Sequence, residues 1–496
     1  MKRIVVDYAL PQTALMFTLL LLSAQQIYGQ GSPQLESPLQ LFENAKPIPL
    51  PKWAPPVDNQ PNQVTRFDVA TQSVSTYDLS EDLSPLPSVG SPGVELPDWA
   101  YPGYDIPDAE ELLTFTNLSL VTNTNEYPWS ASVKLFIEWP NGQIGVCSGA
   151  LIDPKHVLSA GHCVYSHTNG GWADQIFVYP GYQNQQAAFG GGISASLTSL
   201  TGWTVNQDFS FDLSVIELDR HIGGIAGWYG YDQNSNNNFF LNNTFHNPGY
   251  PADPPYDGEF MYYWYGDYDL TFNEIVVHYN LGYPGQSGSN SYHIANNDRR
   301  THAVLTHNAA PFINSSIPAT GHTRLTQGKV NWINNTIADH ISSTPDLLPL
   351  TLFGAPGSIP AGNSLSALSV LIHNYSVAAF SGNLQLEVYL SDNEVISTSD
   401  TEIFSGSVSG FNLPARGTQE VNFTPNSIQV PSTTPLGNYF IGIRIANSDA
   451  DNSNNTSPEY YLMPITVTPP PCLAPVGLNA TSTGYAHVSL SWDPVQ

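Results

Sequence analysis

The sequence predicts an all-β protein. From Tyr127 onward, short segments of alternating apolar and polar residues recur between turn signals, which is the pattern of half-buried strands. Charged residues make up only 11% of the chain, and Asn, Ser, Thr, Gly and Pro take their place. This mix suits strands and turns better than helices. With 496 residues, the chain has room for about two to four domains.

The N-terminus has the features of an export signal. Lys2 and Arg3 precede the apolar run Ala14–Ser23, which is too short to span a bilayer. We therefore expect residues 1–29 to be a signal peptide and the mature protein to be secreted, hence extracellular. Residues 30–118 are rich in Pro, Asp, Glu and Ser and show poor periodicity, so they are predicted to be a pro-segment or linker with limited structure.

Residues 119–342 are predicted to form the first folded domain. Alternation marks its strands in PWSASVKLFIEW, GVCSGALI, HVLSA, QIFVYPGY, LSVIELD and AVLTH. The exception is the segment Thr326–His340, whose apolar residues recur at helical spacing. These residues are Val330, Ile333 and Ile337. We expect one amphipathic helix there, closing the domain.

A second run of strands follows a proline-bounded boundary. Residues 346–468 place turn signals at roughly ten-residue intervals between apolar segments, which predicts a β-sandwich. Pro469–Pro471 is typical of a stiff linker. Residues 472–496 start a new strand pair, in which VSLSW alternates, and stop too soon to bury a core.

The charge balance excludes some classes of partner. The chain carries 14 Lys plus Arg against 42 Asp plus Glu, a formal net charge of −28. This argues against nucleic acid, which needs a basic patch, and against an anionic membrane surface. No later segment is long and apolar enough to span a membrane. No HExxH segment occurs, and neither a metal nor a cofactor is expected.

The three cysteines predict one disulfide. Cys147 and Cys163 lie close in the sequence, and export permits their oxidation. A bridge closing a loop of that size stabilises by roughly 3 kcal/mol in the chain-entropy account. The alternative is a pair of buried free thiols. Cys472 is left over, and an odd cysteine in an exported chain suggests a missing partner.

Three segments carry the residues of an acyl-transfer site. VLSAGHCVY offers His162, FDLSVIEL offers Asp212 and GYPGQSGSN offers Ser287, in that chain order. A histidine base can take the proton of a serine nucleophile, and a buried carboxylate orients the histidine. The oxyanion needs donors fixed in advance, which a glycine-rich turn can supply. We expect the N–H groups of Gly285 and Ser287 to be those donors.

These motifs resemble those of a known family. LSAGHC and GQSGS are similar to the histidine and serine motifs of trypsin-like (chymotrypsin-fold) serine proteases. YPWSASV, CSGALIDPKHVLSAGHC, VYPGYQ, GYPA and GQSGS match, in order, the V8-like glutamyl endopeptidase branch over about residues 119–342. The resemblance implies two six-stranded β-barrels with the site between them, and a serine endopeptidase that acts on protein or peptide substrates.

The resemblance assigns the base to His162, the orienting carboxylate to Asp212 and the nucleophile to Ser287. Asp208 is the alternative to Asp212, which is preferred because DLSVIEL matches the family's pattern of Asp before an apolar strand. The chain departs from the family twice near the serine. Gln286 stands where Asp or Asn is usual, and Asn follows the motif where Pro is usual.

The resemblance also indicates a specificity pocket for the residue that precedes the cleaved bond (P1). Leu281 stands where enzymes that cleave after Lys or Arg have Asp, so that preference is not expected. His307 in AVLTHNA matches the pocket histidine of glutamyl endopeptidases and implies a preference for Glu; the alternative is an ordinary strand histidine. Gly282 stands where these enzymes have Ser or Thr, so one hydroxyl donor is missing and discrimination is expected to be weaker.

The C-terminal region resembles extracellular modules. NYSVAAFSGNLQLEVYLSDN and GNYFIGIRIAN are similar to bacterial cell-adhesion-type Ig-like domains, and residues 472–496 to the opening of a fibronectin type III domain. Contact with an extracellular surface or matrix is expected from them. Two hypotheses follow: an active secreted endopeptidase made as a zymogen, or an inactive protease-like protein that works in adhesion. An α/β-hydrolase is excluded because that fold places Ser before Asp before His.

Overall fold

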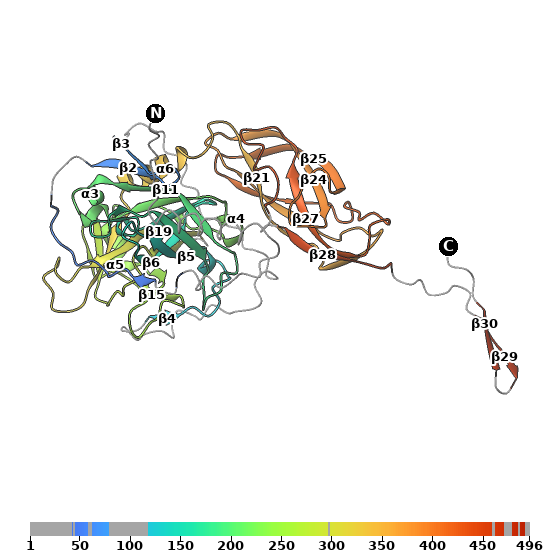
Figure 1. The fold of residues 1–496 in the computed structure, drawn as a ribbon, viewed down its shortest axis with the longest axis horizontal. Coiled ribbons are helices and arrows are strands. Elements are labelled where there is room, and N and C mark those ends of the chain that lie inside the picture. The colour runs from blue at the N-terminus through green and yellow to red at the C-terminus, as the bar shows by residue number, and fades with distance from the viewer. Residues whose placement is uncertain are drawn as a thin grey trace, which may run out of the picture. The chain divides into compact units, whose positions relative to one another are not determined.

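A computed structural model describes Phe42 and residues 45–57, 62–78, 118–295, 298–458, 462–470, 479–484 and 487–491. The predicted signal peptide, residues 1–29, lies outside these ranges. The chain divides into two compact units (Figure 1). The first holds Met1–Asp346, Asn374–Phe380 and Leu413–Thr418, and the second holds Leu347–His373, Ser381–Asn412 and Gln419–Gln496.

The first unit contains a closed six-stranded barrel. Its strands run in the order β10, β5, β6, β7, β12, β11, and β10 pairs with β11 to close the ring. Closure leaves no free edge within this ring. The bounds are β5 Ser132–Glu138, β6 Ile144–Leu151, β7 His156–Ser159, β10 Gln175–Pro180, β11 Gly192–Leu200 and β12 Ser214–Leu218.

The N-terminal region adds strands to this sheet. β1 (Lys46–Pro47) pairs in parallel with β6, and β2 (Gln63–Asp68) pairs antiparallel with β11. β3 (Ser73–Asp78) forms a hairpin with β2. The expectation of limited structure is therefore wrong for these residues. The proline-rich context hid a short strand, QVTRFD, that buries Val64 and Phe67.

The second sheet of this unit is open. Its main strands run in the order β17, β20, β19, β18, β14, β15, with short strands β16, β4 and β13 added to it. The expected all-β fold of two barrels is confirmed, with the first barrel closed and the second a half-barrel, since within the described residues no ladder joins β15 to β17. The bounds are β4 Ser119–Leu120, β13 Gly230–Tyr231, β14 Phe245–Gly249, β15 Tyr262–Gly266, β16 Leu270–Thr271, β17 Ile275–His278, β18 Asn290–Ala295, β19 Asp298–Asn308 and β20 Thr320–Arg324.

Side chains bridge the gap that the backbone leaves. Trp264 on β15 stacks on His278 of β17, with ring centroids 4.1 Å apart. The two strands are thus in contact through aromatic side chains, although within the described residues no backbone ladder joins them.

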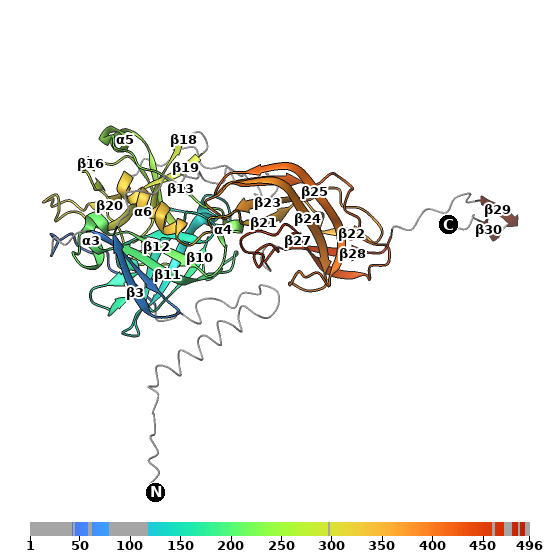
Figure 2. The same cartoon turned by 90° about the horizontal axis from the view of Figure 1, so that it is seen from above.

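The predicted helix is confirmed. α6 (Gln327–Ala338) begins and ends within the expected segment and lies among the strands of the first unit (Figure 2). Its buried residues Val330, Ile333 and Ile337 belong to one core cluster with Leu158 of β7 and Val304 of β19. Burying each aliphatic side chain of this kind contributes roughly 1.5–3 kcal/mol. The helix therefore ties the barrel to the open sheet.

The remaining elements of the first unit are short. They are β8 Tyr165–Ser166, β9 Gly171–Trp172, α3 Thr201–Thr204, α4 Gly223–Ala226, α5 Asn237–Asn242 and the 3-10 turns η2 Trp129–Ala131, η3 Gly161–Cys163 and η4 Phe209–Phe211. Two of these turns, η3 and η4, carry the chain into the candidate site.

The second unit consists of two facing groups of strands. A three-stranded sheet has the order β21, β23, β26, and a five-stranded sheet has the order β22, β28, β27, β24, β25. Along β24, every second residue from Leu384 to Leu390 is buried, as a sandwich requires. The bounds are β21 Leu347–Phe353, β22 Ser358–Pro360, β23 Ser369–Asn374, β24 Phe380–Ser391, β25 Thr401–Leu413, β26 Thr418–Asn422, β27 Gly437–Ile445 and β28 Met463–Thr468.

A last strand pair follows the proline linker. β29 (Asn479–Gly484) and β30 (His487–Ser491) are antiparallel, as expected for residues 472–496. The likeness of these C-terminal parts to Ig-like and fibronectin type III modules stays a prediction.

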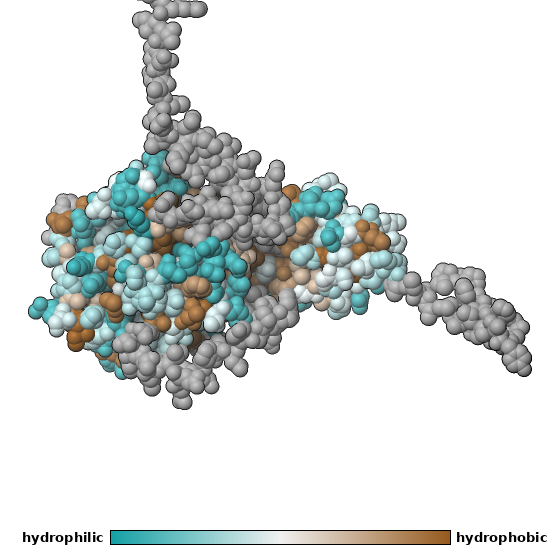
Figure 3. Space-filling view, turned by 60° about the horizontal axis from the view of Figure 1, so that its bottom comes forward, coloured by the Kyte–Doolittle hydropathy of each residue, from teal (hydrophilic) through white to brown (hydrophobic). Residues whose placement is uncertain are grey.

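The surface shown in Figure 3 is a mosaic in which apolar residues are scattered among polar ones. Exposed apolar side chains such as Val205 and Leu281 are single residues of this kind, which is ordinary for a folded protein. Among the described residues, no helix combines the length and apolar character needed to cross a bilayer.

The open sheet buries four histidines, and this has a consequence for acid stability. Burial lowers the pKa of His278, His302 and His307 to about 3, and that of His322 further below its ordinary value. In an unfolded chain a histidine titrates near about pH 6.5. Below that pH the unfolded state binds more protons than the folded state, so the free energy of unfolding decreases as the pH decreases.

We predict that stability falls between pH 7 and pH 5, by on the order of 1 kcal/mol for each buried histidine. Denaturant unfolding at the two pH values measures this. His302→Phe is the matched variant, because His302 already lies 4.8 Å, ring to ring, from Phe239. This substitution should remove the contribution of one histidine to the change in the free energy of unfolding between pH 7 and pH 5. A wild-type stability that is flat between pH 7 and pH 5 would contradict the prediction.

Candidate active site

His162 lies in the turn that follows β7. The 3-10 turn η3 buries Gly161, His162 and Cys163, and His162 is 5% exposed. Cys163 forms a disulfide with Cys147 of β6, so the predicted pairing is confirmed. The bridge ties the histidine turn to the strand beside it. Cys472 lies outside the described residues.

Asp212 holds the histidine at two points. Its Oδ2 is 2.8 Å from His162 Nδ1, and its Oδ1 accepts a hydrogen bond from the His162 main-chain N–H at 2.8 Å. The carboxylate is fully buried just before β12. With Nδ1 donating to Asp212, Nε2 is the nitrogen that can accept a proton.

The alternative carboxylate, Asp208, is used elsewhere. Its side chain accepts a hydrogen bond from the Ser210 N–H at 2.9 Å and so caps η4. The structure therefore pairs His162 with Asp212, four residues further along the chain. Trp203, which the sequence gave no reason to single out, packs edge-on against the His162 ring at 5.9 Å.

Ser287 lies in the tight turn before β18. Gly285 and Gly288 flank the turn with φ values of +90° and +88°, a left-handed conformation that favours glycine. A Cβ on Gly285 would also lie 2.5 Å from the carbonyl oxygen of Tyr250. Ser287 is 0% exposed. Neither Ser287 Oγ nor His162 Nε2 has a hydrogen-bond partner within the described residues, so the two atoms are not hydrogen-bonded to each other and each remains available to a ligand.

The turn holds its backbone in place by contacts that leave two N–H groups unused. Ser148 Oγ donates to the Gly285 carbonyl at 2.8 Å, and the Ser148 N–H donates to the Ser287 carbonyl at 2.8 Å. The Gln286 side chain accepts from the Tyr283 N–H at 2.9 Å. Among the described residues no partner takes the N–H groups of Gly285 and Ser287. These two donors can therefore serve an incoming oxyanion.

His307 is fully buried on β19. Its Nδ1 lies 2.9 Å from Thr306 Oγ1, while its Nε2 has no partner within the described residues. Burial is the main reason why its pKa falls to about 3, with the charge of a nearby imidazole as the lesser cause. The ring is therefore a neutral donor near pH 7.

The imidazole of His307 lies against the backbone of β20. A side chain at Gly321 would overlap the ring. Behind it, His322 and His278 are joined through their Nε2 atoms at 3.0 Å. The sequence did not single out these two histidines. His278 ends the apolar strand IVVH, which was a usable signal, whereas His322 lies among polar residues in TGHTR.

Gly282 meets the same strand. A Cβ on Gly282 would lie 2.9 Å from Thr320 Oγ1, and Thr320 precedes Gly321 on β20. Gly282 therefore meets Thr320, whereas His307 meets the next residue, Gly321, and side chains at these two positions of β20 leave the strand on opposite faces. Thr320 was missed in the sequence, where TGHT gives only the signal of polar residues in a buried strand.

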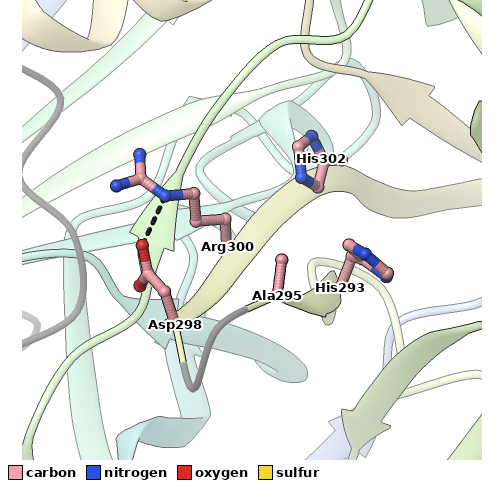
Figure 4. Close-up of a pocket in the computed structure, with 5 residues that line it drawn as sticks. All are labelled: His293, Ala295, Asp298, Arg300 and His302. Atoms are coloured by element: carbon pink, nitrogen blue, oxygen red, sulfur yellow. Dashed lines mark hydrogen bonds and ion pairs between the residues drawn. The ribbon is translucent and has the colours of Figure 1, made fainter. Parts of the chain in front are cut away.

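A separate hollow lies at the other end of β19. His293, Ala295, Asp298, Arg300 and His302 line it (Figure 4). Arg300 Nε donates to Asp298 Oδ2 at 2.6 Å. Nine residues of extended strand separate Asp298 from His307, roughly 30 Å. This hollow is therefore not part of the site around Ser287.

Within the described residues, one group of possible metal ligands lies close together. Its members are Cys147, His162 and Cys163, whose ligand atoms all lie within 4.8 Å of one another. Both sulfurs are committed to the disulfide, and a metal needs thiolates. The donor set does not fit a metal ion.

Comparison with known proteins finds a family that matches part of the first unit. The Trypsin family matches residues 120–237, a range that contains His162 and Asp212 and ends before Ser287. A Bacillus subtilis (strain 168) protein named extracellular metalloprotease is 35% identical over 135 residues, which is 27% of this chain and 42% of the relative. A Bacillus licheniformis glutamyl endopeptidase is 31% identical over 171 residues, which is 34% of this chain and 50% of the relative.

The chain thus spans half or less of the length of these relatives. A solved structure of a Glu endopeptidase in complex with MPD is 23% identical and covers 45% of this chain and 96% of its own, with a TM-score of 0.39. The family match over residues 120–237 shows that this chain contains a trypsin-like serine protease domain.

Proposed function

We propose that the protein is a secreted serine endopeptidase that cleaves peptide bonds through an acyl-enzyme. The observation that supports this best is the His162–Asp212 pair, joined at 2.8 Å, together with an unpartnered Ser287 Oγ in a glycine turn. Secretion is supported by the predicted signal peptide and by the word extracellular in the name of one relative.

The proposed chemistry begins with proton transfer. His162 Nε2 takes the Ser287 Oγ proton as the oxygen attacks the substrate carbonyl, and the oxyanion accepts hydrogen bonds from the N–H groups of Gly285 and Ser287. The imidazolium then gives its proton to the leaving amine, which departs and leaves an ester on Ser287. Water repeats the cycle and releases the acid. Asp212 stays ionised and orients the ring.

A preference for Glu at P1 is part of this proposal. His307 Nε2 is buried and unpartnered, and its imidazole is neutral, so it can donate one hydrogen bond to a carboxylate. One relative is named a glutamyl endopeptidase. The other relative is named a metalloprotease. In this chain, the cluster of Cys147, His162 and Cys163 does not fit a metal ion, because both sulfurs form the disulfide.

The alternative is an inactive protease-like protein that works in adhesion through its sandwich. In that case the buried His162–Asp212 pair and the glycine turn that carries Ser287 would have no catalytic use. A covalent label on Ser287 separates the two hypotheses.

We predict that Ser287→Ala abolishes hydrolysis, by about 10⁶-fold by analogy with other serine proteases. The readouts are casein hydrolysis and labelling by a fluorophosphonate, measured on the exported and processed protein. Asp212→Asn should lose about 10⁴-fold, because the histidine then adopts the wrong tautomer. Asp208→Asn is the matched control and should keep most of the activity. Labelling that persists in Ser287→Ala would show that the nucleophile is another residue.

A second prediction concerns P1. Peptides that differ only at P1, with Glu, Asp, Gln, Phe, Leu or Lys, should be cleaved fastest after Glu. His307→Ala should lower kcat/KM for the Glu peptide by roughly tenfold, because one hydrogen bond to a charged group is lost. His293→Ala, in the remote hollow, is the control. Equal rates for Glu and Gln, or an unchanged ranking in His307→Ala, would refute the preference and leave the catalytic residues unaffected.

A further inference from the structure

The turn that carries the proposed nucleophile is backed by one loop, residues 250–261, which joins β14 to β15. We call it the backing loop. The Ala252 N–H donates to the Pro284 carbonyl at 2.8 Å. A Cβ on Gly285 would lie 2.5 Å from the Tyr250 carbonyl oxygen and 3.1 Å from Ala252 Cβ. The start of the backing loop therefore forms a wall against Gly285, one of the two candidate oxyanion donors.

Ser148 of β6 holds the first end of the backing loop. Its Oγ accepts a hydrogen bond from the Tyr250 N–H at 2.9 Å and donates one to the Gly285 carbonyl at 2.8 Å. A single buried hydroxyl thus connects the loop to the turn. A displacement of the loop is therefore transmitted to the backbone of the oxyanion site.

Lys134 of β5 holds the far end of the backing loop. Its Nζ donates to Glu259 Oε1 at 3.1 Å, and the Tyr182 hydroxyl donates to Glu259 Oε2 at 2.8 Å. Each carboxylate oxygen thus has its own donor. The ammonium group also lies over the Tyr182 ring, 4.0 Å from its centroid, a cation–π contact that offsets part of the lost hydration. The Lys134 side chain is 2% exposed.

Lys134 and Ser148 act from the same side of the barrel sheet. The register of β5 and β6 places these two residues directly opposite each other. Directly opposite residues of an antiparallel pair point to one face, with Cβ atoms about 4.5–5.5 Å apart. Two neighbouring side chains of the barrel therefore hold the backing loop at two places, Tyr250 and Glu259.

A buried lysine is an unusual residue for filling space. Burial disfavours its charged form and lowers the pKa of Lys134 to about 8, although the nearby Glu259 and Asp257 oppose this shift. An apolar side chain of similar size often serves packing equally well or better. What the lysine adds is a fixed position for the Glu259 carboxylate, and hence for the backing loop.

We propose that Lys134 is a positioning residue for the oxyanion site, acting through Glu259 and the backing loop. This rests on the proposed function. With the ion pair intact, the loop stays against Gly285 and keeps its N–H in the orientation that an oxyanion requires. Without the pair, the Glu259 carboxylate is left to Tyr182 and water, and the far end of the loop is held less firmly. The chemical step is then slowed, whereas substrate binding is little affected.

The first test replaces Lys134 by methionine. Lys134→Met should lower kcat by roughly tenfold or more and change KM by less than about twofold, because small displacements of groups at the reacting centre have effects of that size. The loss should be equal for peptides with Glu and with Leu at P1, since both form the same oxyanion.

Lys155→Met is the matched control. Lys155 Nζ also lies 3.1 Å from a carboxylate oxygen, that of Glu217, but Lys155 precedes β7 at the end away from His162. This variant should keep the wild-type kcat. An unchanged kcat in Lys134→Met, or an equal loss in Lys155→Met, would overturn the proposal.

The other partner of the pair covers the case in which Lys134→Met does not fold. Glu259→Gln keeps the shape and removes the charge of a side chain that is 20% exposed, and it should lower kcat in the same way. In the double variant the loss should be no greater than in Lys134→Met alone, because both changes break one contact. Fully additive losses would show two independent roles and overturn the proposal.

A pH profile separates positioning from a purely structural role. Wild-type kcat should fall as the pH rises through about 8, because the ammonium that attracts Glu259 becomes a neutral amine. The other groups that face it are Asp257 and Tyr182, and burial raises the pKa of Tyr182 far above this range. The fall should be absent in Lys134→Met and present in Lys155→Met. An equal fall in Lys134→Met would assign it to another group and overturn the role of the lysine.

Fluorophosphonate labelling of Ser287 keeps the two levels of the proposal apart, and thermal unfolding verifies the fold of each variant. Absent labelling in wild type refutes the proposed function. Complete labelling of every variant with unchanged kcat refutes the role of Lys134 alone.

Discussion

The contact between Asp212 and His162 is the constraint on which the rest of the site depends. A carboxylate removed from water must find hydrogen-bond donors or its burial is strongly unfavourable. His162 supplies two, one from its ring and one from its main chain. Because each oxygen has its own donor, the ring cannot rotate without leaving a buried oxygen unpaired. The carboxylate therefore fixes both the position of the turn and the orientation of the imidazole.

The surrounding strands are built to keep that contact in register. β7 and β12 pair so that Ser159 lies opposite Ser214, and Ser214 Oγ donates to the Ala160 carbonyl at 2.8 Å. The histidine leaves β7 and the aspartate enters β12 from the same end of this pair. The disulfide Cys147–Cys163 then joins the turn to β6, whose Ser148 supports the serine turn. One closed barrel thus carries two of the three residues and steadies the third.

The sequence predicted those features that are encoded locally. His162, Asp212 and Ser287 stand in motifs whose residue types and order are tied to one chemistry, and α6 shows its apolar spacing directly. What it could not predict depends on pairs of distant residues. The open edge between β15 and β17 is one such feature, because no sequence pattern shows that two strands fail to pair. The N-terminal strands were hidden because a proline-rich segment can also be ordered when an existing edge supplies its hydrogen bonds.

Gly282 shows the same limit at the level of one side chain. Read alone, it indicates a lost hydroxyl and a wider pocket. In the fold, Thr320 Oγ1 lies 2.9 Å from the position of a Cβ on Gly282, so the space beside Gly282 is occupied from a neighbouring strand. A pocket is defined by the sum of its walls, and a substitution on one wall can be compensated only by a residue that is near in space.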